Sequence, residues 1–343
     1  MDDNFFLDAL ACRNISRPPV WIMRQAGRYL PQYQEFRKKY ALKELFSHSD
    51  LAADITLLPI DAIGMDAAIL FSDILTIVKG FGFDLDFVEK KGPQIFPRIT
   101  SAAQIQSLPS FDLEKVRHVQ KTITLLKKTL LVPLIGFAGG PFTVASYIFG
   151  GVAEVKAFLY SYPQEMHLLL QKLTEATISY LQMQVAAGAN ALQLFDSWAG
   201  MLPLEEFNMF SLNYLKQIVG SLKKQVPVIV FARGSSLFAK ELAEIGPSCI
   251  SMDFQMPMKD LRKKVPKHIA LQGNLDPELL LGPEDLVRKK TKALLDAMAG
   301  EPGFIVNLGH GVLPATPVAN VKAMVDTVKS YQPMASSSWT ATI

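Results

Sequence analysis

The chain has 343 residues, of which 49% are hydrophobic and 20% are charged. This is enough apolar material for a large core, organised either as one long domain or as two. The net charge of +3 is small and no run of Lys or Arg exceeds three residues, so the composition does not indicate a nucleic-acid-binding protein.

Cysteine usage and the absence of long apolar segments bear on the compartment. Cys12 and Cys249 are the only cysteines, are far apart in the sequence and have no CxxC partner, which is typical of a reducing compartment. The N-terminus, MDDNFFLDALACRN, resembles neither a secretory signal nor an Arg-rich transit peptide. The longest apolar stretch, residues 55–78, is interrupted by three aspartates, so no transmembrane helix is expected. We therefore expect a cytoplasmic protein.

Eight short apolar runs recur along the chain, and each ends in polar residues or glycine. The runs are continuous rather than alternating, which is typical of parallel strands that are buried on both faces. In chain order they are PVWIM (19–23), AAILF (67–71), VPLIGF (132–137), ALQLF (191–195), VPVIVF (226–231), CISM (249–252), IALQG (269–273) and FIVNLG (304–309).

Segments with helical periodicity, such as residues 163–188 and 282–300, separate most of these runs. The alternation predicts an α/β protein, a single (β/α)8 TIM barrel over residues 1–343. Because the spacing is uneven, a doubly wound open sheet stays an alternative. Residues 81–99 alternate between apolar and polar, which predicts a hairpin or extended insert after the second strand. The Ser-rich end, residues 334–343, is expected to be flexible.

In a parallel barrel the active site lies at the C-terminal ends of the strands, so the polar residues that follow each run are candidates. Nearly every run is followed by such a residue, and their convergence on one rim indicates an enzyme. The candidates are Arg24, Arg28, Ser72, Asp73, Tyr147, Asp196, Ser197, Trp198, Arg233, Asp253, Asn307 and His310.

Several candidates also have a purely structural explanation. Arg233 and Asp253 could form an ion pair at the rim, and the turns FAGG and NLGHG could be plain strand exits. AGGPF lacks the spacing of a nucleotide fingerprint. His310 has no second His, Cys or Glu at ligand spacing, so we interpret it as a hydrogen-bond donor rather than a metal ligand.

Asp73 lies between the apolar runs AAILF and ILTIV, and the next basic residue along the chain is Lys79. A desolvated carboxylate is costly unless something neutralises it. Two partners stay open at this point: Arg24 or Arg28 in an ion pair at the rim, or positive charge on a ligand.

Four stretches together resemble the uroporphyrinogen decarboxylase family of haem and chlorophyll biosynthesis: PPVWIMRQAGRYLPQY, AAILFSDILT, GFAGGPFTVASY and NLGHGV. The resemblance extends from about residue 17 to residue 330. It implies a single barrel domain, a homodimer with facing clefts, and a reaction that needs no metal and no cofactor. The implied substrate is uroporphyrinogen III, a cyclic tetrapyrrole with four acetate and four propionate arms, whose acetates become the methyls of coproporphyrinogen III.

The resemblance also implies roles for residues of this chain. Arg24 and Arg28 would meet substrate carboxylates, which suit a planar guanidinium better than an ammonium group. The implied catalytic residues are Asp73, Arg24 and Tyr147. The implied substrate-binding residues are Arg24, Gln25, Ala26, Gly27, Arg28, Arg37, Asp73, Tyr147, Ser197 and His310, with no metal ligand. Family members vary around Ser197, so Trp198 is expected to change the cleft wall.

Residue chemistry fits the implied reaction. Loss of carbon dioxide from an acetate on a pyrrole needs an electron sink, which protonation of a ring carbon supplies. Asp73 can accept hydrogen bonds from the pyrrole N–H groups and stabilise the resulting cation, above a dry floor of Ile69 and Phe71. The Arg24 guanidinium is a poor acid, so we interpret it as a carboxylate holder, or as a proton donor only through a bound water.

Two other functions share some of these features. Corrinoid or thiol methyltransferases have the same barrel but need a zinc site with His and Cys ligands, and no Cys stands near the GHG segment at residues 309–311. A non-catalytic tetrapyrrole carrier would need the arginines but not a buried carboxylate, so Asp73 distinguishes a carrier from an enzyme. We expect uroporphyrinogen and a second copy of the chain as partners, and neither nucleic acid nor membrane.

Overall fold

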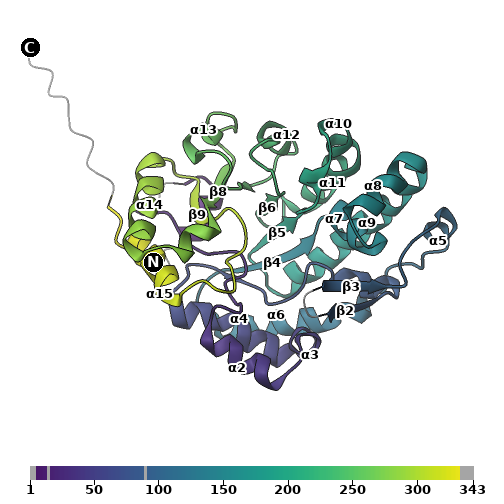
Figure 1. Ribbon diagram of the computed structural model, residues 1–343, viewed down its shortest axis with the longest axis horizontal. Coiled ribbons are helices and arrows are strands. Elements are labelled where there is room, and N and C mark those ends of the chain that lie inside the picture. Colours follow the sequence, from purple (N-terminus) through teal and green to yellow (C-terminus); the bar gives the residue numbers. More distant parts are fainter. Residues whose placement is uncertain (1–4, 14–15, 89–90, 333–343) are drawn as a thin grey trace, which may run out of the picture.

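The computed structural model describes residues 5–13, 16–88 and 91–332. Its centre is a curled parallel sheet of seven strands in the order β1-β4-β5-β6-β7-β8-β9 (Figure 1). The strands are β1 (Ala68–Ile69), β4 (Leu134–Gly139), β5 (Ala191–Phe195), β6 (Val228–Phe231), β7 (Cys249–Ser251), β8 (Ala270–Leu275) and β9 (Phe304–Leu308). Each strand neighbours the next one along the chain with no reversal of order, which excludes the doubly wound alternative for the described residues.

Helices follow the strands and surround the sheet (Figure 1). The α-helices are α1 (Phe5–Leu10), α2 (Pro31–Lys39), α3 (Leu42–Ser47), α4 (Ser49–Ile63), α5 (Ala102–Gln106), α6 (Arg117–Thr129), α7 (Pro141–Phe149), α8 (Val152–Ser161), α9 (Pro163–Ala187), α10 (Leu204–Phe207), α11 (Asn213–Leu222), α12 (Ala239–Glu244), α13 (Met258–Arg262), α14 (Glu284–Ala297) and α15 (Val318–Lys329). Shorter 3-10 helices are η1 (Thr76–Phe81), η2 (Leu113–Val116), η3 (Ala199–Met201) and η5 (Pro277–Leu281), and η4 (Asn208–Leu212) is π-helical.

The prediction of a strand at residues 19–23 is wrong. Val20 makes only an isolated parallel bridge to Val306, whose N–H donates to Pro19 O at 2.9 Å. On the other side, Asp66 N–H donates to Val20 O at 2.8 Å, but Val20 N–H donates to the Asp66 side chain, also at 2.8 Å, instead of to a main-chain carbonyl. Because proline has no N–H and an aspartate side chain takes the next donor, the strand ladder cannot extend along this segment.

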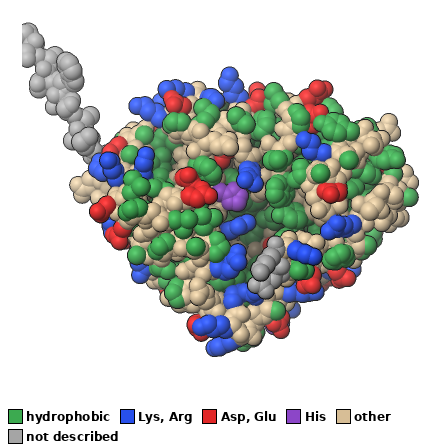
Figure 2. Space-filling model, in the orientation of Figure 1, with side chains coloured by type: hydrophobic (Ala, Val, Ile, Leu, Met, Phe, Trp, Pro, Cys, Tyr) green, Lys and Arg blue, Asp and Glu red, His purple; other side chains and the backbone are tan. Residues whose placement is uncertain are grey.

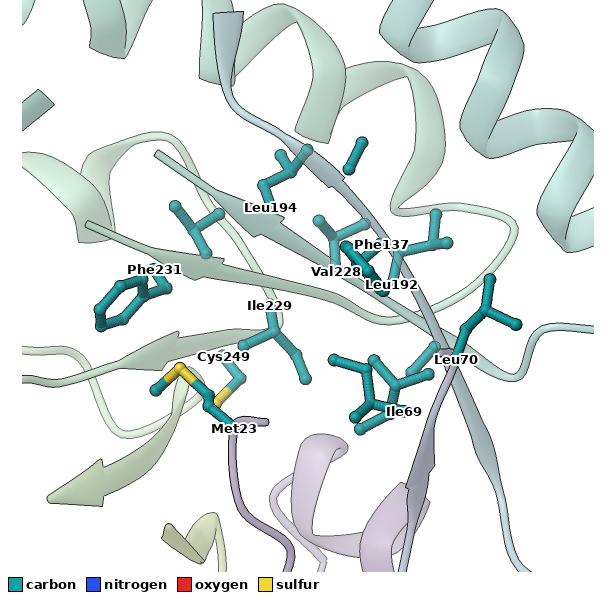
Figure 3. Close-up of a cluster of buried hydrophobic side chains, with 14 of the residues drawn as sticks. Met23, Ile69, Leu70, Phe137, Leu192, Leu194, Val228, Ile229, Phe231 and Cys249 are labelled. Carbon is teal, nitrogen blue, oxygen red and sulfur yellow. The ribbon is translucent and has the colours of Figure 1, made fainter. Parts of the chain in front are cut away.

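The seven remaining apolar runs form strands, and their side chains make the core. Residues of β4, β6, β7, β8 and β9 are buried along the whole of each strand, as continuous apolar runs predict. Figure 3 shows side chains from β1, β4, β5, β6 and β7 packed together with Met23. Each fully buried Leu, Ile or Phe contributes about 1.5–3 kcal/mol, so this cluster fixes the strand ends from which the loops leave.

The predicted insert after the second strand is confirmed as a hairpin of β2 (Asp84–Val88) and β3 (Gly92–Phe96). Leu85 and Ile95 stand directly opposite each other and are both buried, which explains the alternating pattern of the sequence. The hairpin packs on α3 through β2 and on α7 through β3, so it lies along one side of the strand-end loops (Figure 1). The segment 334–343, expected to be flexible, lies outside the described residues.

No single helix in the described ranges is long and apolar enough to cross a membrane. Helices α7 and α8 meet these criteria only when they are taken together, across a bend of 101°.

Candidate active site

Loops at the carboxyl ends of the parallel strands carry most of the predicted site residues. Asp73 follows β1, Tyr147 lies on α7 after β4, Ser197 and Trp198 follow β5, and His310 follows β9. Parallel strands end on the same side of a sheet, so these segments meet although they are far apart in the sequence. On the face shown in Figure 2, Lys and Arg side chains surround a hollow that hydrophobic side chains partly line, with a histidine beside it.

The turn at Arg24 is fixed by the end of β9 and by the loop after it. Met23 N–H donates to Asn307 Oδ1 at 3.1 Å, and Val312 N–H donates to Met23 O at 3.0 Å. Arg24 has a φ of +63°, a left-handed conformation that is uncommon for residues with a side chain. Its side chain runs over Gly311, where an added Cβ would come 2.5 Å from Arg24 Cδ. The backbone turn and this glycine together direct Arg24 onto the loop after β9.

Three predicted arginines present uncompensated positive charge. Arg24, Arg28 and Arg37 are exposed, and in the described part of the chain no ion pair within 4.0 Å includes any of them. Arg37, on α2, donates to Tyr40 O at 3.1 Å. Burial raises the pKa of the Tyr33 hydroxyl, and the charges of Arg37 and Arg28 oppose that rise, so both guanidiniums lie near this one ring. Such a cluster suits a ligand with several carboxylates.

Gln25, Ala26 and Gly27 shape the turn between the first two arginines. Gln25 is fully buried: its Oε1 accepts from Ile22 N–H at 3.3 Å, and its Nε2 donates to Ala67 O at 3.1 Å. The Gln25 side chain is therefore used within the protein. Ala26 and Gly27 are half-buried. Substrate contacts at these three positions stay a prediction.

Asp73 is a carboxylate without a counterion. Its Oδ1 accepts from Leu75 N–H at 2.8 Å, and among the described residues no ion pair within 4.0 Å includes Asp73. Burial raises the pKa of Asp73 to about 6, against the opposing effects of the Leu75 hydrogen bond and the charges of Arg24 and Lys79. The ion pair with Arg24 or Arg28 that the sequence left open is therefore not formed.

Tyr147 and Trp198 form one wall of the site. Their rings meet edge to face with centroids 6.3 Å apart. Burial raises the pKa of the Tyr147 hydroxyl, hydrogen bonding with the Trp198 side chain opposes the rise, and Asp73 adds to it. Tyr147 therefore stays protonated at neutral pH and can donate a hydrogen bond. Ser197 is half-buried at the start of the same turn as Trp198.

Asp196 anchors that turn rather than facing a ligand. It is fully buried, and its Oδ1 accepts from the Thr143 N–H at 2.8 Å and from the Thr143 hydroxyl at 2.6 Å. Its Oδ2 accepts from the Ser211 hydroxyl at 2.6 Å. These bonds tie the end of β5 to the start of α7 and to η4, so they position Ser197 and Trp198.

His310 is held in its neutral form. Burial lowers the pKa of His310 to about 4, and the positive charges of Arg24 and Arg233 lower it further in the same direction. Its ring meets Phe231 edge to face, with centroids 5.9 Å apart. A neutral imidazole beside two guanidiniums can donate or accept a hydrogen bond at neutral pH, and the role of His310 as a hydrogen-bond donor to a ligand stays a prediction.

Comparison with known proteins decides the family. A family model described as uroporphyrinogen decarboxylase (URO-D) matches residues 1–331. The chain is 47% identical over 329 residues to uroporphyrinogen decarboxylase of Protochlamydia amoebophila, covering 94% of this chain and 90% of that protein. It is 42% identical over 337 residues to uroporphyrinogen decarboxylase of Desulfotalea psychrophila, covering 96% and 98%. The chain belongs to the uroporphyrinogen decarboxylase family.

Solved structures with a similar fold include other enzyme classes. A methyltransferase from Methanosarcina mazei has a TM-score of 0.79 at 21% identity and covers 96% of this chain and 98% of its own. A B12-independent methionine synthase from Shewanella sp. W3-18-1 has a TM-score of 0.54 at 12% identity, with 85% and 90% covered. At these identities the likeness concerns the fold alone, so decarboxylase and methyltransferase chemistry must be separated by residues of the site.

In the uroporphyrinogen decarboxylase family no metal is expected. Within residues 5–13, 16–88 and 91–332, no group of three or more His, Cys, Asp or Glu is placed to hold a metal ion. The zinc ligands that a methyltransferase would need are thus not assembled in that part of the chain. That this protein reacts without a metal or a cofactor stays a prediction, made from its resemblance to the family.

The ion pair between Arg233 and Asp253, which the sequence left open, is not found among the described residues. Asp253 is buried, and its carboxylate accepts from the Ser236 hydroxyl and, at 3.1 Å, from Gln255 N–H. Its own N–H donates to Ser235 Oγ at 2.9 Å. Asp253 therefore stabilises the loops after β6 and β7, whereas Arg233 is exposed and adds positive charge beside the site.

Two residues near Asp73 were not predicted from the sequence. Tyr180, on α9, is buried and hydrogen-bonds the side chain of Ser72, the neighbour of Asp73. Lys79, on η1, is half-buried, and burial lowers its pKa while the charge of Asp73 opposes that change. Helical periodicity places Tyr180 on a buried face, but the strand end that it meets depends on how α9 packs.

Proposed function

We propose that this protein converts uroporphyrinogen III to coproporphyrinogen III by decarboxylating its four acetate arms, without a cofactor. The observation that carries the proposal is the state of Asp73. Its carboxylate has no counterion among the described residues, its pKa is raised to about 6, and unpaired arginines lie around the same strand ends. The site thus offers one position for a cation and several for carboxylates, which is the charge pattern of a tetrapyrrole with a protonated ring and acidic arms.

The positively charged side chains and the Asp73 carboxylate bind different parts of the substrate. Arg24, Arg28 and Arg37 hold carboxylate arms through N–H donors, and Ser197 and neutral His310 add uncharged hydrogen bonds. Asp73 accepts from the pyrrole N–H groups. A carboxyl with a pKa near 6 is mainly ionised at neutral pH, so it is ready to stabilise a cation when one forms.

The reaction exchanges one carbon dioxide for one proton at each arm. A proton added to the pyrrole α-carbon next to the carbon that bears the acetate makes the ring cationic, and the acetate-bearing carbon stays conjugated with the positive charge. The bond between the arm's methylene and its carboxylate then breaks, and its electron pair passes into the ring and neutralises the cation. The methylene takes up a second proton to become a methyl, and the ring carbon returns its proton. Asp73 stabilises the cation, and Tyr147 donates a hydrogen bond beside it.

Arg24 is unsuited to supply these protons directly, because a guanidinium is a very weak acid. Its exposed side chain reaches solvent, so we assign it to holding the reacting carboxylate, or to donating through a bound water.

We further propose that the curled sheet is a closed (β/α)8 barrel in a single domain over residues 1–343. Support comes from the segment 19–21, which hydrogen-bonds Val306 of β9 on one side and Asp66, just before β1, on the other. This segment takes the eighth position with too few main-chain bonds to count as a strand.

We also propose a cytoplasmic homodimer that binds neither nucleic acid nor membrane. Large apolar side chains are exposed on the loops after β5, β6 and β7: Met201, Leu237 and Phe254 are 52%, 68% and 42% exposed. A second copy covering this rim would bring two clefts face to face and remove that surface from water. Sedimentation should show a dimer that Leu237→Glu weakens, and a monomer at every concentration would contradict the assembly.

The test of the function is anaerobic incubation with uroporphyrinogen III, followed by separation of the oxidised porphyrins by carboxylate number. We expect stepwise loss of four carboxylates, ending at coproporphyrin. A bound but unchanged substrate would identify a carrier, and methyl transfer that requires zinc would identify a methyltransferase.

A further inference from the structure

A side pocket opens next to the wall formed by Tyr147 and Trp198. It has a volume of about 360 Å³ and is lined by β3, the loop after it, and the end of α7. Neither Asp73 nor Arg24 lines it, so it is separate from the position where the reaction is proposed to occur. Tyr147 belongs to both places, which makes the pocket an extension of the site.

Arg98 supplies the charge of this pocket. Its guanidinium lies on the backbone of Gly150, where an added Cβ would come 2.7 Å from Nη1 and 2.8 Å from Cζ. Gly150 has a φ of +95° and ends α7, and the carbonyl end of a helix attracts a cation. Arg98 Nη2 also donates to Gln94 Oε1 at 3.2 Å. Arg98 is therefore positioned by neutral groups.

No carboxylate neutralises Arg98 among the described residues. Elsewhere Arg17 pairs with Asp66 at 2.7 Å and Arg117 pairs with Glu114 at 2.7 Å, but no ion pair within 4.0 Å includes Arg98. The Glu154 side chain, on α8, lies against Gly151 at one edge of the pocket without lining it. Lys91 adds a second cation to the pocket, and Ile95, Val152 and Trp198 give it apolar walls.

We infer that this pocket, named here the Arg98 pocket, binds one propionate arm of the tetrapyrrole. The inference rests on the proposed function. A propionate has apolar methylenes that suit Ile95 and Val152, and a carboxylate that suits Arg98. Because the reacting acetate must lie at Arg24, on the ring whose cation Asp73 stabilises, the arm in a pocket beyond Tyr147 does not react, and propionates are the arms that the reaction leaves intact. Arg98 is thus a substrate-binding residue that orients the macrocycle.

The test uses direct binding as well as turnover. Uroporphyrin III and coproporphyrin III, the oxidised forms, are titrated by fluorescence into the wild type, Arg98→Gln and Arg98→Lys. Both porphyrins carry all four propionates. We expect Arg98→Gln to raise the Kd of both porphyrins about fivefold. KM for uroporphyrinogen III should rise by a similar factor, and kcat should stay unchanged. Arg98→Lys should lose less affinity for the porphyrins than Arg98→Gln does. The difference in affinity between the wild type and Arg98→Gln should shrink at high salt.

The matched control is Arg117→Gln, which removes an exposed arginine that does not line the pocket and should leave Kd and KM unchanged. If Arg117→Gln weakened porphyrin binding as much as Arg98→Gln, the effect would come from the change in net charge alone, and the inference would be overturned. Unchanged affinity of Arg98→Gln for both porphyrins would overturn the inference about the Arg98 pocket. Turnover by the wild type would still uphold the proposed function in that case. Weaker binding of uroporphyrin alone would place an acetate in the pocket, against the inference. A wild type that neither binds nor turns over would refute the proposed function itself.

Discussion

The Arg24 side chain runs directly over the α-carbon of Gly311, at a separation that leaves no space for a methyl group. Gly311→Ala would place Cβ 2.5 Å from Arg24 Cδ, and the exposed arginine must then move away. We expect kcat/KM to fall about tenfold, because the displaced Arg24 holds the reacting carboxylate less well. A tenfold fall corresponds to about 1.4 kcal/mol of lost transition-state stabilisation. The thermal midpoint should change little, because an exposed side chain can move at small cost. Steady-state kinetics and thermal unfolding on one preparation check both.

Gly220→Ala is the matched control for that substitution. Gly220 lies in α11, and an added Cβ there meets nothing within 4 Å. Replacing a helical glycine by alanine should stabilise the protein by about 0.5–1 kcal/mol and leave kcat/KM unchanged. If Gly311→Ala also had wild-type kcat/KM, the contact would not position Arg24 for catalysis.

Arg28→Lys tests whether the arginines bind carboxylates through a planar pair of donors. The variant keeps the charge but loses the bidentate geometry, so kcat/KM for uroporphyrinogen III should fall at least about tenfold. Arg117→Lys, on an exposed helix face, should have no effect. A wild-type kcat/KM for Arg28→Lys would remove Arg28 from the site.

The raised pKa of Asp73 predicts an unusual dependence of stability on pH. In the folded protein the pKa is about 6, against an ordinary value of 3.8. The folded state therefore binds this proton more tightly than the unfolded state does. As a result, the free energy of unfolding falls by up to about 3 kcal/mol as pH rises from about 4 to above 6. Asp73→Asn lacks this loss, so it should be more stable than the wild type at pH 7.5, and the difference should shrink to about 1 kcal/mol at pH 4.5.

Urea unfolding of both proteins at a series of pH values measures that difference. Asn keeps an oxygen that can accept from Leu75 N–H, so the hydrogen bond at 2.8 Å need not be lost. If Asp73 were instead paired with an arginine, Asn would destabilise the protein by about 3–5 kcal/mol at pH 7.5. A less stable Asn variant at that pH would therefore contradict the uncompensated carboxylate.

Chelation tests the expectation that no metal takes part. After exhaustive treatment with a strong chelator, activity towards uroporphyrinogen III should be unchanged without any added cofactor. Activity that chelation abolishes and zinc restores would contradict the cofactor-free reaction and favour methyltransferase-like chemistry.

Much of the fold could be predicted because its signals are local. Continuous apolar runs mark strands buried on both faces, and seven of them form the parallel sheet. The run at residues 19–23 has the same composition but fails as a strand, because Pro18 and Pro19 stand at its start and the Asp66 side chain takes the N–H of Val20. That hydrogen bond joins distant segments and leaves no trace in the local pattern.

The candidate site could be predicted in part for the same reason. The rule that parallel strands end on one side located Asp73, Tyr147 and His310 without an alignment. Contacts between distant loops could not be found this way: the packing of Arg24 on Gly311 and of Arg98 on Gly150 depends on how loops meet in three dimensions. The same holds for Asp73, whose lack of a counterion is a property of its surroundings and not of its neighbours in sequence.

The central claim is that Asp73 stabilises a cation formed on the substrate, and the kcat of Asp73→Asn tests it most directly. Asn has nearly the same shape and keeps an oxygen acceptor, but it carries no negative charge. In anaerobic assays at pH 7 on a folded preparation, kcat should fall about 10²–10³-fold or more, the size of effect seen when one preorganised electrostatic group is removed. A kcat within a fewfold of the wild type would contradict the account and leave Asp73 without a catalytic role.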